Sequence, residues 1–262
     1  MRIVKLLALA GMAAMCAVAQ QTDDASLAKA AQNPIAKLIS VPIQNNLNFG
    51  LGPYDRIQNI TNIQPVIPVT IGKWNLINRT IMPVTRQPDI SSPEGSVFGL
   101  GDINHTTFIS PAQPGRVVWG VGPSITLRSA TDDMLGSGKW SAGPSAVALT
   151  MPGKWVIGAL VSNVWSFAGD SERAAVNAFL LQYFVNYNLP KGWYLSSAPV
   201  VTANWKAKSG KWTVPFGGGV GRVFRIGKQA MNAQVQAFGS SVRPENGPSW
   251  TLRMQLQFLF PK

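Results

Sequence analysis

The sequence contains few side chains that could carry out covalent chemistry, and His105 is its only histidine. A hydrolase built on His105 would need a serine and an orienting amide or carboxylate within hydrogen-bond reach on neighbouring strands. Asn104, Thr106 and Thr107 flank the histidine, so any serine would have to come from elsewhere in the chain. We therefore interpret His105 as a residue of a lumen or an aromatic girdle. A hydrolase is the alternative, and we expect no catalytic residue, no metal site and no cofactor.

Two other motifs resemble ligand-binding patterns but lack essential parts. The glycine-rich run 217–221 has neither the following helix nor the Lys-Ser/Thr of a phosphate-binding loop, so a bent strand is the preferred interpretation. Asp132 and Asp133, with Asp170 and Glu172 in a later polar stretch, could bind a divalent cation. Solvated loops explain these four acids more simply.

Three Asn-x-Thr sequences match the glycosylation sequon, at 59–61, 78–80 and 104–106. All three fall within runs that read as strands. We interpret them as amides and hydroxyls that face a lumen.

The first residues of the chain have the pattern of a secretory signal peptide. Residues 1–19 combine a basic start, a short apolar core and a small-x-small site at Ala17–Ala19. Cleavage after Ala19 would remove Cys16, the only cysteine, and two basic residues, which lowers the formal charge from +12 to +10. Residues 20–37 follow as a periplasmic or lumen segment with a short helix that Pro34 ends.

The remainder of the chain, residues 38–262, contains twelve runs of about ten to thirteen residues, a length that suits tilted membrane-spanning strands. The period of two is clearest from Trp250 to Phe260, where apolar even positions alternate with polar odd positions. The runs are roughly 40–51, 56–70, 74–87, 98–110, 116–128, 140–150, 155–166, 175–189, 193–206, 211–224, 230–242 and 249–260.

Short turns and longer polar links alternate between these runs, as they do in outer-membrane barrels. Tryptophans cluster where strands meet turns, and we expect Trp74, Trp155, Trp193 and Trp250 at the membrane interface. A soluble β-sandwich is the alternative, but only 13% of the residues are charged, against roughly 25% in typical globular domains. Prolines inside the runs count against a closed ladder, and bulges near the rims are the expected solution.

The basic residues are the set with the clearest functional meaning, with 23 Lys and Arg against 11 Asp and Glu. They are scattered between apolar runs, which excludes a nucleic-acid-binding surface. Some are expected on the lumen wall, where a narrow passage of low dielectric would favour anions. The alternative is that they pair with lipopolysaccharide phosphates or are solvated in turns. The predicted lumen and selectivity residues are Arg79, Asp102, Arg128, Arg253, Gln255 and Gln257.

Several stretches resemble a family of bacterial outer-membrane barrels that is described as transporters of the MetA-pathway of phenol degradation, some members of which carry the misleading label neuromedin U. The resemblance covers essentially the whole mature chain, and it implies a barrel for uptake of small, often aromatic or hydrophobic compounds. It offers no catalytic residues. The matching stretches include FGLGDIN (98–104), WGVGP (119–123), ATDDMLGSGKWSAGPSAVAL (130–149), WSFAGD (165–170), VNYNLPKGWYLSSAPVVTANW (185–205), WTVPFGGGVGRVFRIGKQ (212–229) and the closing LQFLFPK.

Taken together, these patterns predict an all-β protein, a single antiparallel transmembrane β-barrel of about twelve strands with a short N-terminal helix. The expected location is the outer membrane, with lipid and lipopolysaccharide around the wall and a small-molecule solute inside it. The predicted function is passive uptake of small aromatic, hydrophobic or anionic compounds. A hydrolase and a non-conducting surface-binding barrel remain alternatives, and the oligomeric state is left open.

Overall fold

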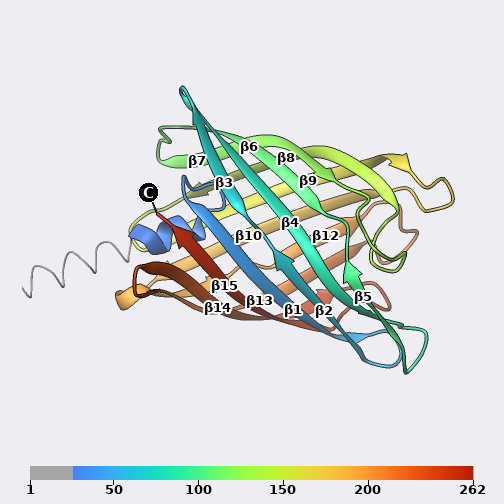
Figure 1. Cartoon of the computed structure of the whole chain (residues 1–262). Helices are drawn as coiled ribbons and strands as arrows, with labels where there is room; N and C mark the ends of the chain where they lie inside the picture. The colour runs from blue at the N-terminus through green and yellow to red at the C-terminus, as the bar shows by residue number, and fades with distance from the viewer. Residues whose placement is uncertain (1–25, 262) are drawn as a thin grey trace, which may run out of the picture.

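The structure, a computed structural model, describes residues 26–261 of the chain, so the expected signal peptide lies outside the described residues. Fifteen antiparallel strands form one sheet that closes on itself, because β1 pairs with β15 and β9 pairs with β10 (Figure 1). Three crossings consist of two strands each, so the wall has twelve crossings, and the predicted fold class is confirmed. The strands are β1 (Ile39–Leu51), β2 (Arg56–Ile63), β3 (Val66–Ile71), β4 (Trp74–Pro88), β5 (Ser96–Leu100), β6 (Asn104–Pro111), β7 (Val117–Thr126), β8 (Lys139–Thr150), β9 (Trp155–Gly169), β10 (Asn177–Asn188), β11 (Trp193–Ser197), β12 (Val200–Asn204), β13 (Trp212–Ile226), β14 (Gln229–Val242) and β15 (Trp250–Phe260), with a 3-10 turn, η1 (Pro190–Gly192), before β11.

The alternation in the sequence becomes two faces of the wall, because successive side chains of a strand point to opposite sides. In β15, Trp250, Met254 and Leu256 are exposed on the outside. Thr251 and Arg253 line the interior cavity. In β15 the apolar face therefore lies on the outside of the barrel and the polar face lines the lumen.

Prolines explain why some crossings are divided and where the ladder has gaps. Pro65 separates β2 from β3, and Pro199 separates β11 from β12. Pro123 and Pro144 lie opposite each other, and each faces a gap in the pairing with the strand on its other side. A proline has no N–H to give to the ladder, so the pairing stops there. The expected bulge occurs at Pro215, where the register shifts, and breaks or gaps accommodate the four prolines named above. Three further prolines lie within strands whose register continues past them: Pro42, Pro68 and Pro83.

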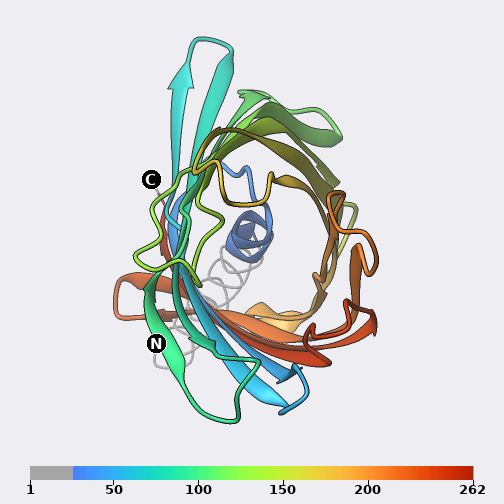
Figure 2. The same cartoon turned by 90° about the vertical axis from the view of Figure 1, so that its right-hand side faces the viewer.

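The segment before β1 fills one end of the barrel. Residues 26–32 form an α-helix that lies inside the ring of strands (Figure 2). Leu27 and Ala28 pack with the interior side chains of Tyr194, Val223 and Leu259 in one buried cluster. No helix within residues 26–261 is long and apolar enough to cross a bilayer.

Polar contacts also hold this segment, which we call the plug (residues 26–38). The Lys29 ammonium donates to the Gly153 carbonyl at 2.6 Å, and the Gln32 side-chain amide donates to the Asn188 amide oxygen at 2.9 Å. Ile35 joins a second buried cluster with the interior residue Phe108. The plug is thus attached to the wall at several strands.

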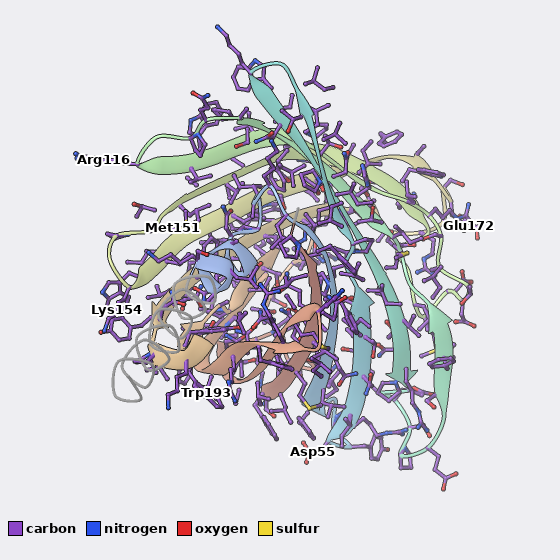
Figure 3. The ribbon with its side chains drawn as sticks, turned by 60° about the vertical axis from the view of Figure 1, so that its left-hand side comes forward. Asp55, Arg116, Met151, Lys154, Glu172 and Trp193 are labelled. Atoms are coloured by element: carbon purple, nitrogen blue, oxygen red, sulfur yellow. The ribbon has the colours of Figure 1, made fainter. Side chains whose placement is uncertain are left out.

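The two ends of the barrel differ in loop length and in charge. The end that holds the plug has short turns, and five of them carry a basic residue: Lys73, Arg116, Lys154, Lys191 and Lys228. All acidic residues that the structure describes lie in the long links of the opposite end or in the break between β5 and β6. Arg116 and Lys154 lie near the helix, whereas Asp55 and Glu172 lie at the far end (Figure 3).

Candidate pore

The lumen contains a cavity of about 1150 Å³ between the plug and the long links. Its wall is built mainly from amides, hydroxyls and small or apolar side chains that the inward positions of the strands supply. Four basic residues line it, and none of the described lining residues is acidic. The basic residues are Arg79, Arg173, Arg253 and Lys211. The cavity therefore presents positive charge to a solute.

Arg253 is held on the lumen wall by neutral partners. Its Nε donates to the Asn46 amide oxygen at 2.9 Å and its Nη1 to the Ala198 carbonyl at 2.9 Å. The guanidinium carbon lies 4.8 Å from the ring centroid of Phe238, in cation–π contact. Since these contacts fix the side chain without neutralising it, its full charge acts on the cavity.

Arg79 lies deeper, beside the plug. Its Nη2 donates to the Gln64 amide oxygen at 2.8 Å, and no carboxylate of the described residues pairs with it. Both Arg79 and Gln64 also line a second cavity of about 150 Å³, which the plug residues border. The two cavities share five lining residues, which mark the boundary between the open lumen and the plugged end. They are Gln44, Gln64, Arg79, Leu160 and Gln182.

The other predicted lumen residues lie in different places. Gln255 and Gln257 line the small cavity beside the plug, and Gln257 accepts a hydrogen bond from Asn232 at 3.1 Å. Arg128 lies beyond the end of β7 and is exposed, because the strand ends two residues earlier than the sequence suggested. Neither interior cavity is lined by Arg128 or Asp102.

Asp102 anchors a long link instead. Its carboxylate accepts hydrogen bonds from the Ser137 amide at 2.7 Å, the Ser137 hydroxyl at 2.8 Å and the Ala130 amide at 3.3 Å. Arg173 holds the same link from the other side, through the carbonyls of Asp133 and Gly136. The link 127–138 is therefore fixed across the cavity mouth, where Ser137 and Arg173 are lining residues.

The acidic residues of the long links make contacts within the links and with Arg173. Within residues 26–261 no group of three or more His, Cys, Asp or Glu is placed to hold a metal. Asp132 and Asp170 each accept a hydrogen bond from a backbone amide two residues ahead, and Asp133 pairs with Arg173 at 3.7 Å. Asp132, Asp133 and Asp170 thus use their carboxylates in contacts that shape the links.

The four predicted interface tryptophans lie on the outside at the two ends of the wall. Trp74, Trp155 and Trp193 begin strands at the short-turn end, and each is 42% to 46% exposed. Trp250 lies at the other end, stacked on Phe49 with ring centroids 4.0 Å apart. Aromatic residues at both ends of an apolar wall are typical of membrane-spanning barrels.

His105 faces outward, not into the lumen, since its neighbours Asn104 and Thr106 line the cavity. Its Nδ1 lies 3.0 Å from the Thr80 hydroxyl and its Nε2 lies 3.2 Å from the Thr107 hydroxyl. The Thr107 hydroxyl donates to the Asn78 amide oxygen at 2.9 Å. That hydroxyl proton is therefore directed away from the imidazole, so the arrangement does not activate Thr107 as a nucleophile.

Polar side chains that point outward and not into the lumen also correct the interpretation of the Asn-x-Thr sequences. Asn104 and Thr106 face the lumen as expected. At 59–61 and 78–80, however, the middle residues Ile60 and Arg79 line the cavity, so their flanking amides and hydroxyls point outward. The expectation of lumen-facing polar groups is wrong at these two sites.

Some lining residues were not predicted from the sequence because they are apolar. Phe108 and Phe238 are buried on the interior face, and Leu160 lines both cavities. Their inward position follows from the period of two once the neighbouring polar residues are assigned. The link residues Arg173 and Lys211 could not be found this way, because links have no such period.

No family model and no curated protein matches the sequence. Solved structures are similar in fold. An outer membrane channel from Pseudomonas putida F1 matches with a TM-score of 0.65 and 16% identity, over 85% of this chain and 94% of that one. Outer membrane phospholipase A from Escherichia coli matches with a TM-score of 0.44 and 13% identity, over 85% and 96%. At such identities the likeness shows the fold alone, which is that of outer-membrane β-barrels.

Proposed function

We propose that this protein is an outer-membrane channel through which small solutes pass passively. The observation that carries the proposal is the interior cavity of about 1150 Å³, which four basic residues line and which shares five lining residues with the smaller cavity beside the plug. An apolar outer wall with aromatic residues at both ends suits a bilayer. Short turns of such barrels face the periplasm, so the plug would close the periplasmic end.

The lining favours small anions that also carry an apolar or aromatic part. Arg79 and Arg253 offer guanidinium groups, which bind carboxylates through paired hydrogen bonds. Phe238 and Leu160 supply apolar surface in the same cavity. This combination suits the small aromatic compounds that the resemblance to barrels of the phenol-degradation pathway implies. An aromatic carboxylate is the substrate class that fits both the guanidinium groups and the apolar surface.

Single-channel recording in planar bilayers tests the proposal. The purified protein should give discrete conductance steps, and a salt gradient should give a reversal potential of the sign expected for anion preference. Arg253→Gln and Arg79→Gln should each reduce that preference severalfold, because each removes an uncompensated charge from the lumen. Arg116→Gln, in an exposed turn, is the matched control and should leave the preference at 1 M KCl unchanged, because the field of an exposed charge is screened within about 3 Å there.

The absence of both conductance and solute flux in a correctly folded protein would refute the channel and favour a non-conducting barrel. Conductance without anion preference would leave the channel standing and refute the proposed substrate class. Flux measured with benzoate and with benzyl alcohol separates recognition of the carboxylate from recognition of the aromatic ring. Loss of benzoate flux in the two arginine variants, with benzyl alcohol flux kept, is the expected result.

A further inference from the structure

Polar side chains gather on one side of the outer wall, where a bilayer would offer them no hydrogen-bond partners. They lie on β1, β2, β4 and β6, and each alternates with residues that line the lumen. We call this set the outer-wall patch: Asn45, Asn59, Thr61, Asn78, Thr80, His105 and Thr107.

The patch lies in the middle of the wall. Asn45 pairs in register with Met254 of β15, which lies between the two terminal aromatic residues of that strand, Trp250 and Phe260. Elsewhere the outward residues at mid-wall are apolar and exposed, as Val161, Val235 and Met254 are. Other outward amides, such as Asn163, lie beside tryptophans at the end of the wall. The outer surface is thus asymmetric, with one polar side.

Half of the patch satisfies its own hydrogen bonds and half does not. Both ring nitrogens of His105 are bonded, as described above. In the other half, the Asn45 amide nitrogen donates to the Asn59 amide oxygen at 2.8 Å and to the Thr61 hydroxyl at 2.8 Å. The Asn45 oxygen and the Asn59 nitrogen then have no partner among residues 26–261. One is an acceptor and the other a donor, so two copies of this surface can satisfy each other.

A groove of about 950 Å³ on the outer wall includes Asn59 and Thr61 and extends toward the long links. Apolar residues line it with them, and Phe98 at its side is 74% exposed. Asp55 and Arg86 lie on the same groove. They carry opposite charges, so the Asp55 carboxylate of one copy can meet the Arg86 guanidinium of another across a twofold axis.

We propose that the outer-wall patch and its groove form the interface between two copies of this chain in the membrane. A lipid fits less well. Acyl chains offer no hydrogen bonds, and Arg56, the second cation of the groove, already donates to the carbonyls of Ser92 at 2.6 Å and Gly95 at 2.7 Å. The inference rests on the proposed membrane location, but not on conductance.

Thiol cross-linking in isolated outer membranes tests the interface. Asn59→Cys, treated with a short bifunctional thiol reagent, should give a dimer band. Val235→Cys, which faces outward on the apolar side, is the matched control and should give at most a tenth of that yield. The native Cys16 falls in the segment expected to be cleaved, so each mature variant would carry one thiol. Equal yields, or monomer alone, would overturn the proposal.

A double-mutant cycle identifies the contact. Asp55→Asn and Arg86→Gln should each lower the Asn59→Cys dimer yield severalfold, and the double variant should lower it no further, because both single changes remove the same pair. Additive losses would contradict the pairing.

A monomer that retains lipopolysaccharide in a stoichiometric ratio, and loses it in Arg86→Gln, would assign the groove to a lipid instead. Unaltered mobility of the unboiled protein on a detergent gel verifies that each variant is folded, and absence from the outer-membrane fraction would refute the proposed location itself.

Discussion

The glycine run of β13 is where a single residue decides how the barrel holds its plug. A Cβ at Gly221 would overlap the ring of Tyr194, and one at Gly219 would overlap the carbonyl of Val235. Tyr194 is 1% exposed, donates its hydroxyl to the Asn232 amide oxygen at 2.7 Å, and packs against Leu27 of the plug. Gly221 therefore makes room for a side chain of the cluster that holds the helix, and Gly219 allows the close approach of β14, which are different roles from binding phosphate.

Replacing Gly221 should loosen this support. Gly221→Val is expected to lower the free energy of unfolding by about 1–3 kcal/mol, because it overpacks a filled interior and displaces the Tyr194 ring. Urea denaturation in detergent micelles, followed by tryptophan fluorescence, measures the change. Gly115→Val is the control, since nothing lies within 4 Å of a Cβ there and the residue is in a turn. Equal effects of the two substitutions would contradict this account.

At the scale of elements, the plug and the wall are joined by contacts that a motion could release one by one. Lys29 contacts the turn between β8 and β9, Gln32 contacts β10, and Ile35 packs in a cluster that includes Phe108 of β6. Deletion of residues 20–37 should therefore leave the ring of strands intact and raise the single-channel conductance severalfold. Gln32→Ala, which removes a hydrogen bond from the plug, should increase the fraction of time in the higher-conductance state. A deletion variant that folds and keeps the original conductance would show that the plug does not limit the pore.

The sequence predicted the elements better than their contacts. The twelve predicted runs matched twelve crossings because the two faces of a strand meet different environments, which imposes a period of two on the sequence. That period can be read from neighbouring residues alone. The outward direction of Asn59 and Asn78 was missed because polar residues were assumed to face the lumen, and here they break that rule. Arg128 was misplaced because a strand end depends on its neighbours' register, and the role of Asp102 depends on a link whose path no local pattern encodes.

For the whole molecule, closure of the sheet gives a direct physical expectation. A barrel has no free edge, so every ladder must open together when it unfolds, and such proteins resist detergent until heated. The unboiled protein should migrate on a detergent gel at an apparent mass different from that of the boiled protein, which should run at the mass of the unfolded chain, 28.2 kDa before the expected cleavage of residues 1–19. A soluble protein with identical mobility before and after boiling would be inconsistent with the membrane barrel.

The distribution of charge over the whole molecule sets how its selectivity should respond to salt. Fixed cations line the cavity at Arg79, Arg173, Lys211 and Arg253 and lie at the short turns, while the described acids lie in the long links of the opposite end or, as Asp102 does, in the break between β5 and β6. The field of exposed turn residues is screened within about 10 Å at 0.1 M salt and about 3 Å at 1 M. Guanidinium groups inside a narrow lumen are screened less, because the low-dielectric wall confines their field. Anion preference should therefore fall between 0.1 M and 1 M KCl but persist in part, and the persistent part should fall severalfold in the Arg79→Gln, Arg253→Gln double variant, in which Arg173 and Lys211 are the remaining cations of the cavity. Complete loss of preference at 1 M KCl in the unmodified protein would assign selectivity to the turns and not to the lumen.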